Sequence, residues 1–192
     1  MAAAEPRPAA ATRDIPDAEA EPERDDTLYV ANAGIVLAGP YIPMLFSRLG
    51  LTEGRRFVDD AAVERATHLL QFMVDGAEEP APEHRLTLNK LLCGLDLVQP
   101  VDRDFRITDA EREAIESLLK AMIQRWTIIG RTSVAGLRES FFQRQGALTL
   151  EPEAWRLRVE PRSFDMLIDQ IPWGFATLKL PWMAQVLHVD WR

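Results

Sequence analysis

Cysteine is almost absent from this sequence, since Cys93 is the only one among 192 residues. A single cysteine excludes a disulfide within the chain and is typical of proteins of reducing compartments. Cys93 lies in the apolar stretch 91–95, which contains no cation or base that would hold the thiol as a nucleophilic thiolate. The sequence therefore predicts a buried structural thiol. A small cysteine hydrolase that pairs Cys93 with His68 or His84 is a distant alternative.

Patterns that bind metals or phosphates are also missing. The three histidines, His68, His84 and His188, share no ligand spacing, and the glycines are too dispersed to form a phosphate-binding loop. The acidic pairs at 59–60 and 78–79 occupy turn-like positions. Helix caps and solvated loops explain such pairs better than acid–base catalysis does. We therefore expect no cofactor, no metal and no enzymatic activity.

The chain has no excess of basic residues. Its 22 basic and 30 acidic side chains give a net charge of −8. Residues 1–26 hold three arginines and eight acidic residues, or −5, which leaves −3 for the remainder. Non-specific binding to DNA or RNA needs a broad basic field. Nucleic acid is therefore excluded from the expected partners.

Long apolar runs are missing as well. A membrane-spanning helix needs about 18 uncharged apolar residues in a row, and the best candidate, residues 29–46, is interrupted by glycines and prolines. The first 15 residues contain arginines but no apolar run, so they do not form a secretory signal. A soluble cytoplasmic protein that does not contact membranes is the expected class.

Composition divides the chain into two parts. Residues 1–26 are mainly alanine, proline and acidic residues with almost nothing to bury, which predicts a disordered tail. Residues 27–192 carry the apolar periodicity expected of a single globular domain. Within it, the apolar run 28–37 fits either a short buried strand or an irregular segment, because its length does not distinguish them.

Helical periodicity dominates the middle of the chain. Thr108 and Glu111 form a capping-box pattern, in which each side chain satisfies a backbone N–H at the start of a helix. Either Asp59 or Asp60 can cap an earlier helix. The helices that we expect cover 41–49, from 59 or 60 to 76, 88–95, 108–130, and from 132 or 133 to 146.

The last quarter of the chain changes to alternating patterns that predict strands. These strands are expected at 147–150, 155–159, 176–180 and 185–191, with one or two helical turns at 163–168. The predicted fold class is therefore α+β, mainly α. It consists of an amphipathic helix bundle with a small C-terminal antiparallel sheet and a disordered N-terminal tail.

Tryptophan and arginine supply the candidate partner-binding residues. Trp173 and Trp182 each follow a proline in matching Pro-Trp motifs nine residues apart. Either they pack the sheet onto the helices or, as a pair, they anchor a partner subunit, because tryptophan is enriched at interface hot spots. Arg138 is a third candidate, and Arg138 and Glu139 could make exposed or interface ion pairs. For Arg138, as for the arginines at 131 and 144, a solvated helix face is the expected state.

Several of these strings occur together in an order that resembles a known family. From residue 27 to 191 the chain is similar to the tape measure proteins of contractile injection systems, the phage-tail-like particles that some bacteria assemble. The strings that carry the resemblance are 29–34, 40–43, 65–70, 88–95, Trp126, 132–133, 137–138, 142–144 with Gly146, 155–160 and the two Pro-Trp motifs.

The resemblance implies a structural role. Such a protein acts while the inner tube of the particle polymerises, and it sets or terminates the length of the tube without catalytic residues. Its partners would be inner-tube, baseplate hub or cap proteins. Its setting would be the bacterial cytoplasm or the assembled particle.

Chain length favours docking over direct measurement. A fully helical segment of 165 residues spans about 250 Å, whereas the glycine and proline breaks predict a globule with a radius of gyration of about 15 Å. We therefore expect this chain to dock at one end of the tube or to cooperate with a longer protein. An assembly chaperone or adaptor that leaves the finished particle is the alternative.

Overall fold

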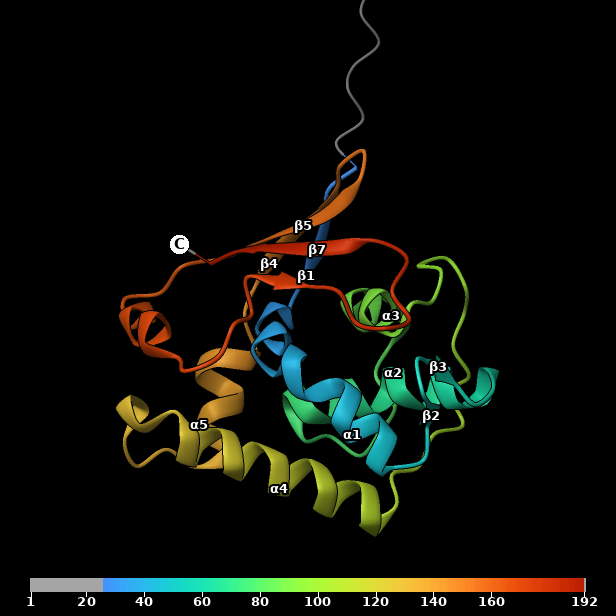
Figure 1. Cartoon of the computed structure of the whole chain (residues 1–192), viewed down its shortest axis with the longest axis horizontal. Helices are drawn as coiled ribbons and strands as arrows, with labels where there is room; N and C mark the ends of the chain where they lie inside the picture. Colours follow the sequence, from blue (N-terminus) through green and yellow to red (C-terminus); the bar gives the residue numbers. More distant parts are fainter. Residues whose placement is uncertain (1–25, 192) are drawn as a thin grey trace, which may run out of the picture.

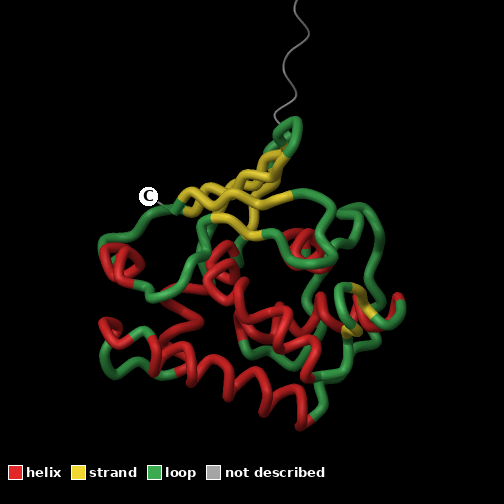
Figure 2. Tube along the Cα trace, in the orientation of Figure 1, coloured by secondary structure: helices red, strands yellow, loops and turns green. Residues whose placement is uncertain are grey.

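The computed structural model describes residues 26–191, so the predicted disordered tail lies, except for Asp26, outside the described residues. A twisted sheet covers one side of a larger helical layer, and α4 (Asp109–Arg125) lies on the side farthest from the sheet (Figure 1). Figure 2 shows the same division between strands and helices. The α+β, mainly α fold class is confirmed.

The helices follow the predicted order, although some end earlier than predicted. Glycines at positive φ end three of them, because Gly50, Gly76 and Gly94 tolerate this conformation without a Cβ clash. Besides α4, the α-helices are α1 (Ile42–Arg48), α2 (Asp60–Asp75), α3 (Thr87–Cys93) and α5 (Val134–Leu137). A π-helical turn, η4 (Arg138–Phe142), extends α5. The 3₁₀ helices are η1 (Ala33–Tyr41), η2 (Glu83–Arg85), η3 (Thr127–Ile129) and η5 (Asp165–Gln170).

The predicted caps are present. Asp59 rather than Asp60 caps α2, and its Oδ1 accepts from the N–H of Ala62 at 2.7 Å. Thr108 and Glu111 form the complete capping box of α4, with both reciprocal bonds made. Local side-chain chemistry therefore determines where these two helices begin.

The apolar run after residue 27 matches neither expected alternative, a short buried strand or an irregular segment, because it forms a short, mostly exposed strand and then a buried 3₁₀ helix. It begins as strand β1 (Leu28–Val30) and continues as η1, which is buried over almost its whole length. The helix passes so close to η4 that a Cβ at Gly34 would overlap the carbonyl oxygen of Phe141. Only glycine allows this approach. Because η1 contacts both the helices and the sheet, it lies at the centre of the core, between the two (Figure 1).

The sheet is mixed rather than wholly antiparallel. Its order is β1-β4-β5-β7-β6, with β4 at Gly146–Leu150, β5 at Ala154–Val159, β6 at Thr177–Leu178 and β7 at Val186–Asp190. All neighbours pair antiparallel except β5 and β7, which are parallel. The prediction of a purely antiparallel sheet is wrong at this pair, because the long connection 160–185 crosses over before β7 returns beside β5. A second, two-stranded sheet, β2 (Thr52–Glu53) with β3 (Arg56–Phe57), was not predicted.

None of the helices in residues 26–191 combines the length and the apolar character needed to cross a membrane.

Candidate interaction surfaces

Cys93 is a buried thiol at the end of α3. It is 2 % exposed, and burial raises the pKa of the thiol to about 12, although a hydrogen bond with Thr67 acts in the opposite direction. His68 is engaged elsewhere, since its Nε2 lies 2.7 Å from the carbonyl oxygen of Asp102 and its ring stacks on Phe105. The predicted burial of the thiol is confirmed.

The acidic pairs have the structural roles predicted for them. Asp59 caps α2, and Glu78 forms an exposed ion pair with Arg112 that lowers the pKa of the Glu78 carboxyl. Within residues 26–191, no three His, Cys, Asp or Glu side chains lie close enough together to hold a metal ion.

Trp173 packs against the end of η1. Its Nε1 donates to the carbonyl oxygen of Leu37 at 2.9 Å, and its ring meets Tyr41 edge-on at 5.3 Å and Trp126 at 6.4 Å between centroids. The indole is half-buried. It therefore fastens the C-terminal region to the helical layer while part of the ring stays at the surface.

Trp182 makes a similar connection at another place. Its Nε1 donates to the carbonyl oxygen of Leu92 in α3 at 2.8 Å, and its ring lies 5.7 Å from Phe46 and 4.8 Å from Phe57. This ring is also half-buried. The packing role weighed for both tryptophans is present, whereas their role as partner anchors stays a prediction.

Arg138 lies inside the protein rather than on a solvated helix face. It is 9 % exposed. Its guanidinium donates to the carbonyl oxygens of Met73 and Phe72 at 3.1 and 3.3 Å and pairs with Glu116 at 3.0 Å. The expected solvated face is wrong because the carbonyl oxygens in the last turn of α2, where the helix dipole is negative, attract the Arg138 cation. A contact with a partner subunit stays a prediction for this residue.

Arg144 is fully buried, so the expected solvated face is wrong here too. Its two terminal nitrogens bind the two carboxylate oxygens of Asp165 at 2.8 and 2.7 Å. Asp165 also accepts from Trp191 Nε1 and from the N–H of Arg162. Sequence reasoning missed this cluster because its other members lie between 18 and 47 positions after Arg144 and share no local pattern with it.

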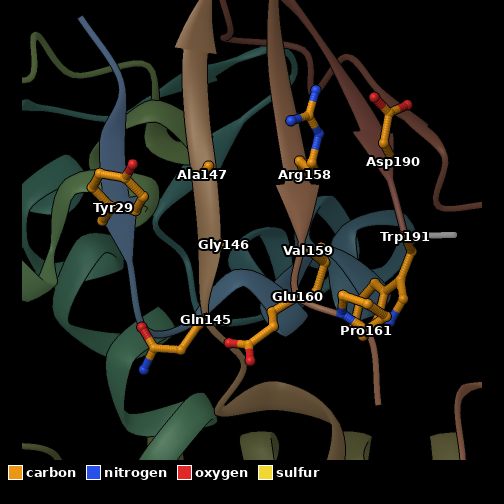
Figure 3. Close-up of a pocket in the computed structure, with 10 residues that line it drawn as sticks. All are labelled: Tyr29, Gln145, Gly146, Ala147, Arg158, Val159, Glu160, Pro161, Asp190 and Trp191. Atoms are coloured by element: carbon orange, nitrogen blue, oxygen red, sulfur yellow. The ribbon is translucent and has the colours of Figure 1, made fainter. Parts of the chain in front are cut away.

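The most exposed candidate surface is the outer face of the sheet. The registers place Tyr29, Ala147, Arg158 and Asp190 in one row across β1, β4, β5 and β7 (Figure 3). Beside this row lies an open cavity of about 570 Å³ whose lining residues include no serine, cysteine or histidine. The lining combines the exposed Tyr29 ring with the charged side chains of Arg158, Glu160 and Asp190. Tyr29 was not singled out from the sequence, because a single tyrosine in an apolar run carries no signal of exposure.

Arg156 organises the charges next to that row. It pairs with Glu151 in the hairpin and, at 3.1 Å, with Asp190 on β7. Both carboxylates raise the pKa of Arg156, and Arg156 in turn lowers the pKa of Glu151. Arg158, by contrast, is exposed on the same face and makes no ion pair within residues 26–191.

Comparison with known families identifies the chain as a whole. The family model described as contractile injection system tape measure protein matches residues 2–191, including the N-terminal segment that the resemblance from residue 27 onward left out. No match was found among curated proteins or solved structures. With the match spanning nearly every residue, the chain belongs to the contractile injection system tape measure protein family.

Proposed function

We propose that this protein is a non-enzymatic assembly component that docks at one end of the inner tube and thereby sets or terminates the length of the tube. The observation that carries the proposal is the match to the tape measure family over residues 2–191. The partners would be inner-tube, baseplate hub or cap proteins of the particle. Assembly would take place in the bacterial cytoplasm, with the protein retained in the finished particle.

The shape of the described residues supports docking over direct measurement. Helices and sheet fold back on one core, with η1 packed against α1, α2, η4 and the sheet (Figure 1). A body of this kind offers surfaces to other subunits instead of spanning a tube. Cys93 lends no support to the cysteine hydrolase alternative, because its thiol is buried and its pKa is about 12.

The test separates docking from a ruler mechanism. A strain that lacks the gene is complemented with the wild-type chain or with a chain in which residues 1–25 are repeated twice more, and particle lengths are measured by electron microscopy. The 50 added residues could span up to about 165 Å when extended. Docking predicts the same tube length for both chains, and uncontrolled or absent tubes without the gene.

Tubes that lengthen with the added residues would instead establish a ruler. Quantifying the protein in purified particles distinguishes the assembly chaperone or adaptor, which would be absent from them, from a retained component. If deletion of the gene changes neither the number nor the length of particles, the proposed function is wrong.

A further inference from the structure

The sheet has one protected edge and one open edge. The edge strand β6 has only two residues and is followed by Lys179 and Pro181, which discourage the addition of another strand. At the opposite edge, β1 (Leu28–Val30) contains neither a lysine nor a proline, and Tyr29 is 76 % exposed. Among the residues that the structure describes, nothing pairs with the outer side of β1, so of the two edges this one is the more open to an added strand.

The hydrogen-bond pattern shows which backbone groups this edge offers. In the hairpin, Glu151 N–H donates to Ala154 and Glu160 N–H donates to Gln145, so the odd-numbered residues of β4 bond to β5. The even-numbered residues of β4 therefore bond to β1, through the pairs Leu148 with Leu28 and Gly146 with Val30. Between these pairs, Tyr29 directs its backbone N–H and C=O away from β4, toward the open side.

Apolar side chains surround those free backbone groups. Leu28 and Tyr29 are exposed on opposite faces of β1. Strand β4 runs two residues past the start of β1, and Leu150, at its end, is also exposed. The β4–β5 hairpin and β1 project beyond the helical layer at this point (Figure 1). An incoming strand would thus meet two main-chain hydrogen-bonding groups with an apolar contact on each face.

The charge of this edge defines the chemistry of the strand that it accepts. Asp26, Glu151 and Glu153 lie at the projecting tip, where Glu151 has Arg156 as its ion partner and His188 as a second basic neighbour. In the sequence, residues 1–25 carry seven acidic and three basic side chains. Opposite charges steer partners together, so an occupant rich in lysine or arginine is favoured.

We propose that the free edge of β1 binds an extended, basic segment of an inner-tube, hub or cap subunit as an added strand of the sheet. Main-chain hydrogen bonds to Tyr29 would give affinity, and alternating apolar side chains against Leu28, Leu150 and the Tyr29 ring would give specificity. This inference rests on the proposed function for the identity of the partner.

The experiment uses the full chain and overlapping 15-residue peptides that cover the tube, hub and cap proteins of the same particle. Binding is measured by fluorescence anisotropy, and amide hydrogen exchange is measured by NMR. In the free chain the Tyr29 amide should exchange fast while those of Leu28 and Val30 are protected. A basic peptide should bind, weaken with added salt, and protect the Tyr29 amide.

Two variants at one position separate the backbone from the side chain. Tyr29→Pro removes the outward N–H but leaves the β1–β4 bonds, because proline is tolerated on an edge strand whose N–H faces solvent. Tyr29→Thr removes the ring but keeps the N–H and a strand-forming residue. We expect Tyr29→Pro to weaken peptide binding at least fivefold more than Tyr29→Thr, with equal melting temperatures. If Tyr29→Pro loses stability, the wild-type chain provides the test instead. Protection of its Tyr29 amide by the bound peptide would support the proposal, and an unprotected amide would contradict it.

Four outcomes would overturn the proposal. The first two are that no peptide binds and that the two variants bind with equal affinity. The third is a Tyr29 amide that is already protected in the dilute chain, which would assign the edge to residues 1–25. The fourth is protection that rises with protein concentration, which would assign the edge to a second copy of the chain. None of them bears on the tube-length measurement. Failure of the strand edge is therefore distinguishable from failure of the proposed function.

Discussion

At the scale of single residues, two opposite charges are buried together inside the protein. Arg144 and Asp165 are both buried and bind through two parallel hydrogen bonds of 2.8 and 2.7 Å. Burial alone would raise the pKa of Asp165, but the bonds from Arg144, Arg162 and Trp191 outweigh burial and lower that pKa below its ordinary value. Each charge therefore depends on the other.

The first prediction concerns the loss of one partner of this pair. Asp165→Asn leaves the Arg144 guanidinium buried without a counter-charge, so we expect the free energy of unfolding to fall by about 3–5 kcal/mol. Urea titration followed by tryptophan fluorescence measures it. Glu113→Gln on the exposed face of α4 is the control and should change stability by less than about 0.5 kcal/mol. A loss at Asp165 as small as that of the control would contradict the role of the pair.

The second prediction follows from the direction of the same pKa shift. A carboxyl whose pKa is lower in the folded than in the unfolded chain stabilises the fold above the unfolded-state pKa. That stability is lost as the pH falls through the folded-state value. The free energy of unfolding of the wild type should therefore decrease from about pH 5 downward. The Asp165→Asn chain should show a shallower decrease in parallel urea titrations, and identical slopes would show that Asp165 does not contribute.

The third prediction tests the buried thiol. With a pKa of about 12, Cys93 should react with a thiol reagent at pH 8 only when the chain opens, so labelling should accelerate in step with denaturant-induced unfolding. Cys93→Ala should leave particle assembly intact. Complete loss of assembly by a folded, stable Cys93→Ala protein would instead favour chemistry at this residue.

At the scale of elements, the C-terminal end of α2 is stabilised both by a glycine and by an arginine side chain. Gly76 ends the helix at φ +71°, and Arg138 binds the carbonyl oxygens of Phe72 and Met73 one turn earlier. A Cβ at Gly76 would lie 2.9 Å from the Arg138 guanidinium. Gly50, after α1, has the same φ of +71° but nothing within 4 Å.

The fourth prediction uses this matched pair of glycines. Gly50→Ala should cost about 1–2 kcal/mol, because only the left-handed conformation is penalised there. Gly76→Ala should cost more, since the new methyl group also displaces Arg138 from its carbonyls. Chemical denaturation of both variants gives the difference. Equal losses would show that the Arg138 side chain yields freely and does not tie α2 to η4.

Elements whose signals are local could be predicted from the sequence, and elements that depend on distant contacts could not. Asp59, Thr108 and Glu111 act within one helical turn, so the starts of α2 and α4 were correct. The parallel pairing of β5 with β7 and the burial of Arg144 depend on neighbours far along the chain. No periodicity in a single window carries that information, and the same holds for the exposed row on the outer face of the sheet.

At the scale of the whole molecule, Trp173 and Trp182 connect the C-terminal quarter to the helical layer, as Trp126 does from the other direction. Each of the three indoles donates to a distant backbone carbonyl, at 2.9, 2.8 and 3.0 Å. Trp126 is 1 % exposed, whereas the other two are half-buried. Of these three indoles, Trp173 and Trp182 therefore have ring surface that another subunit can reach.

The fifth prediction separates packing from partner contact at these positions. Trp→Phe at 126, 173 or 182 removes one hydrogen bond of similar length, so each should cost about 1 kcal/mol or somewhat more of stability. Incorporation into particles, measured by quantitative mass spectrometry of purified particles, should fall for Trp173→Phe and Trp182→Phe beyond the fall for Trp126→Phe. If all three variants are incorporated in proportion to their stability, the rings only hold the sheet on the helices, and the partner must bind elsewhere on the body.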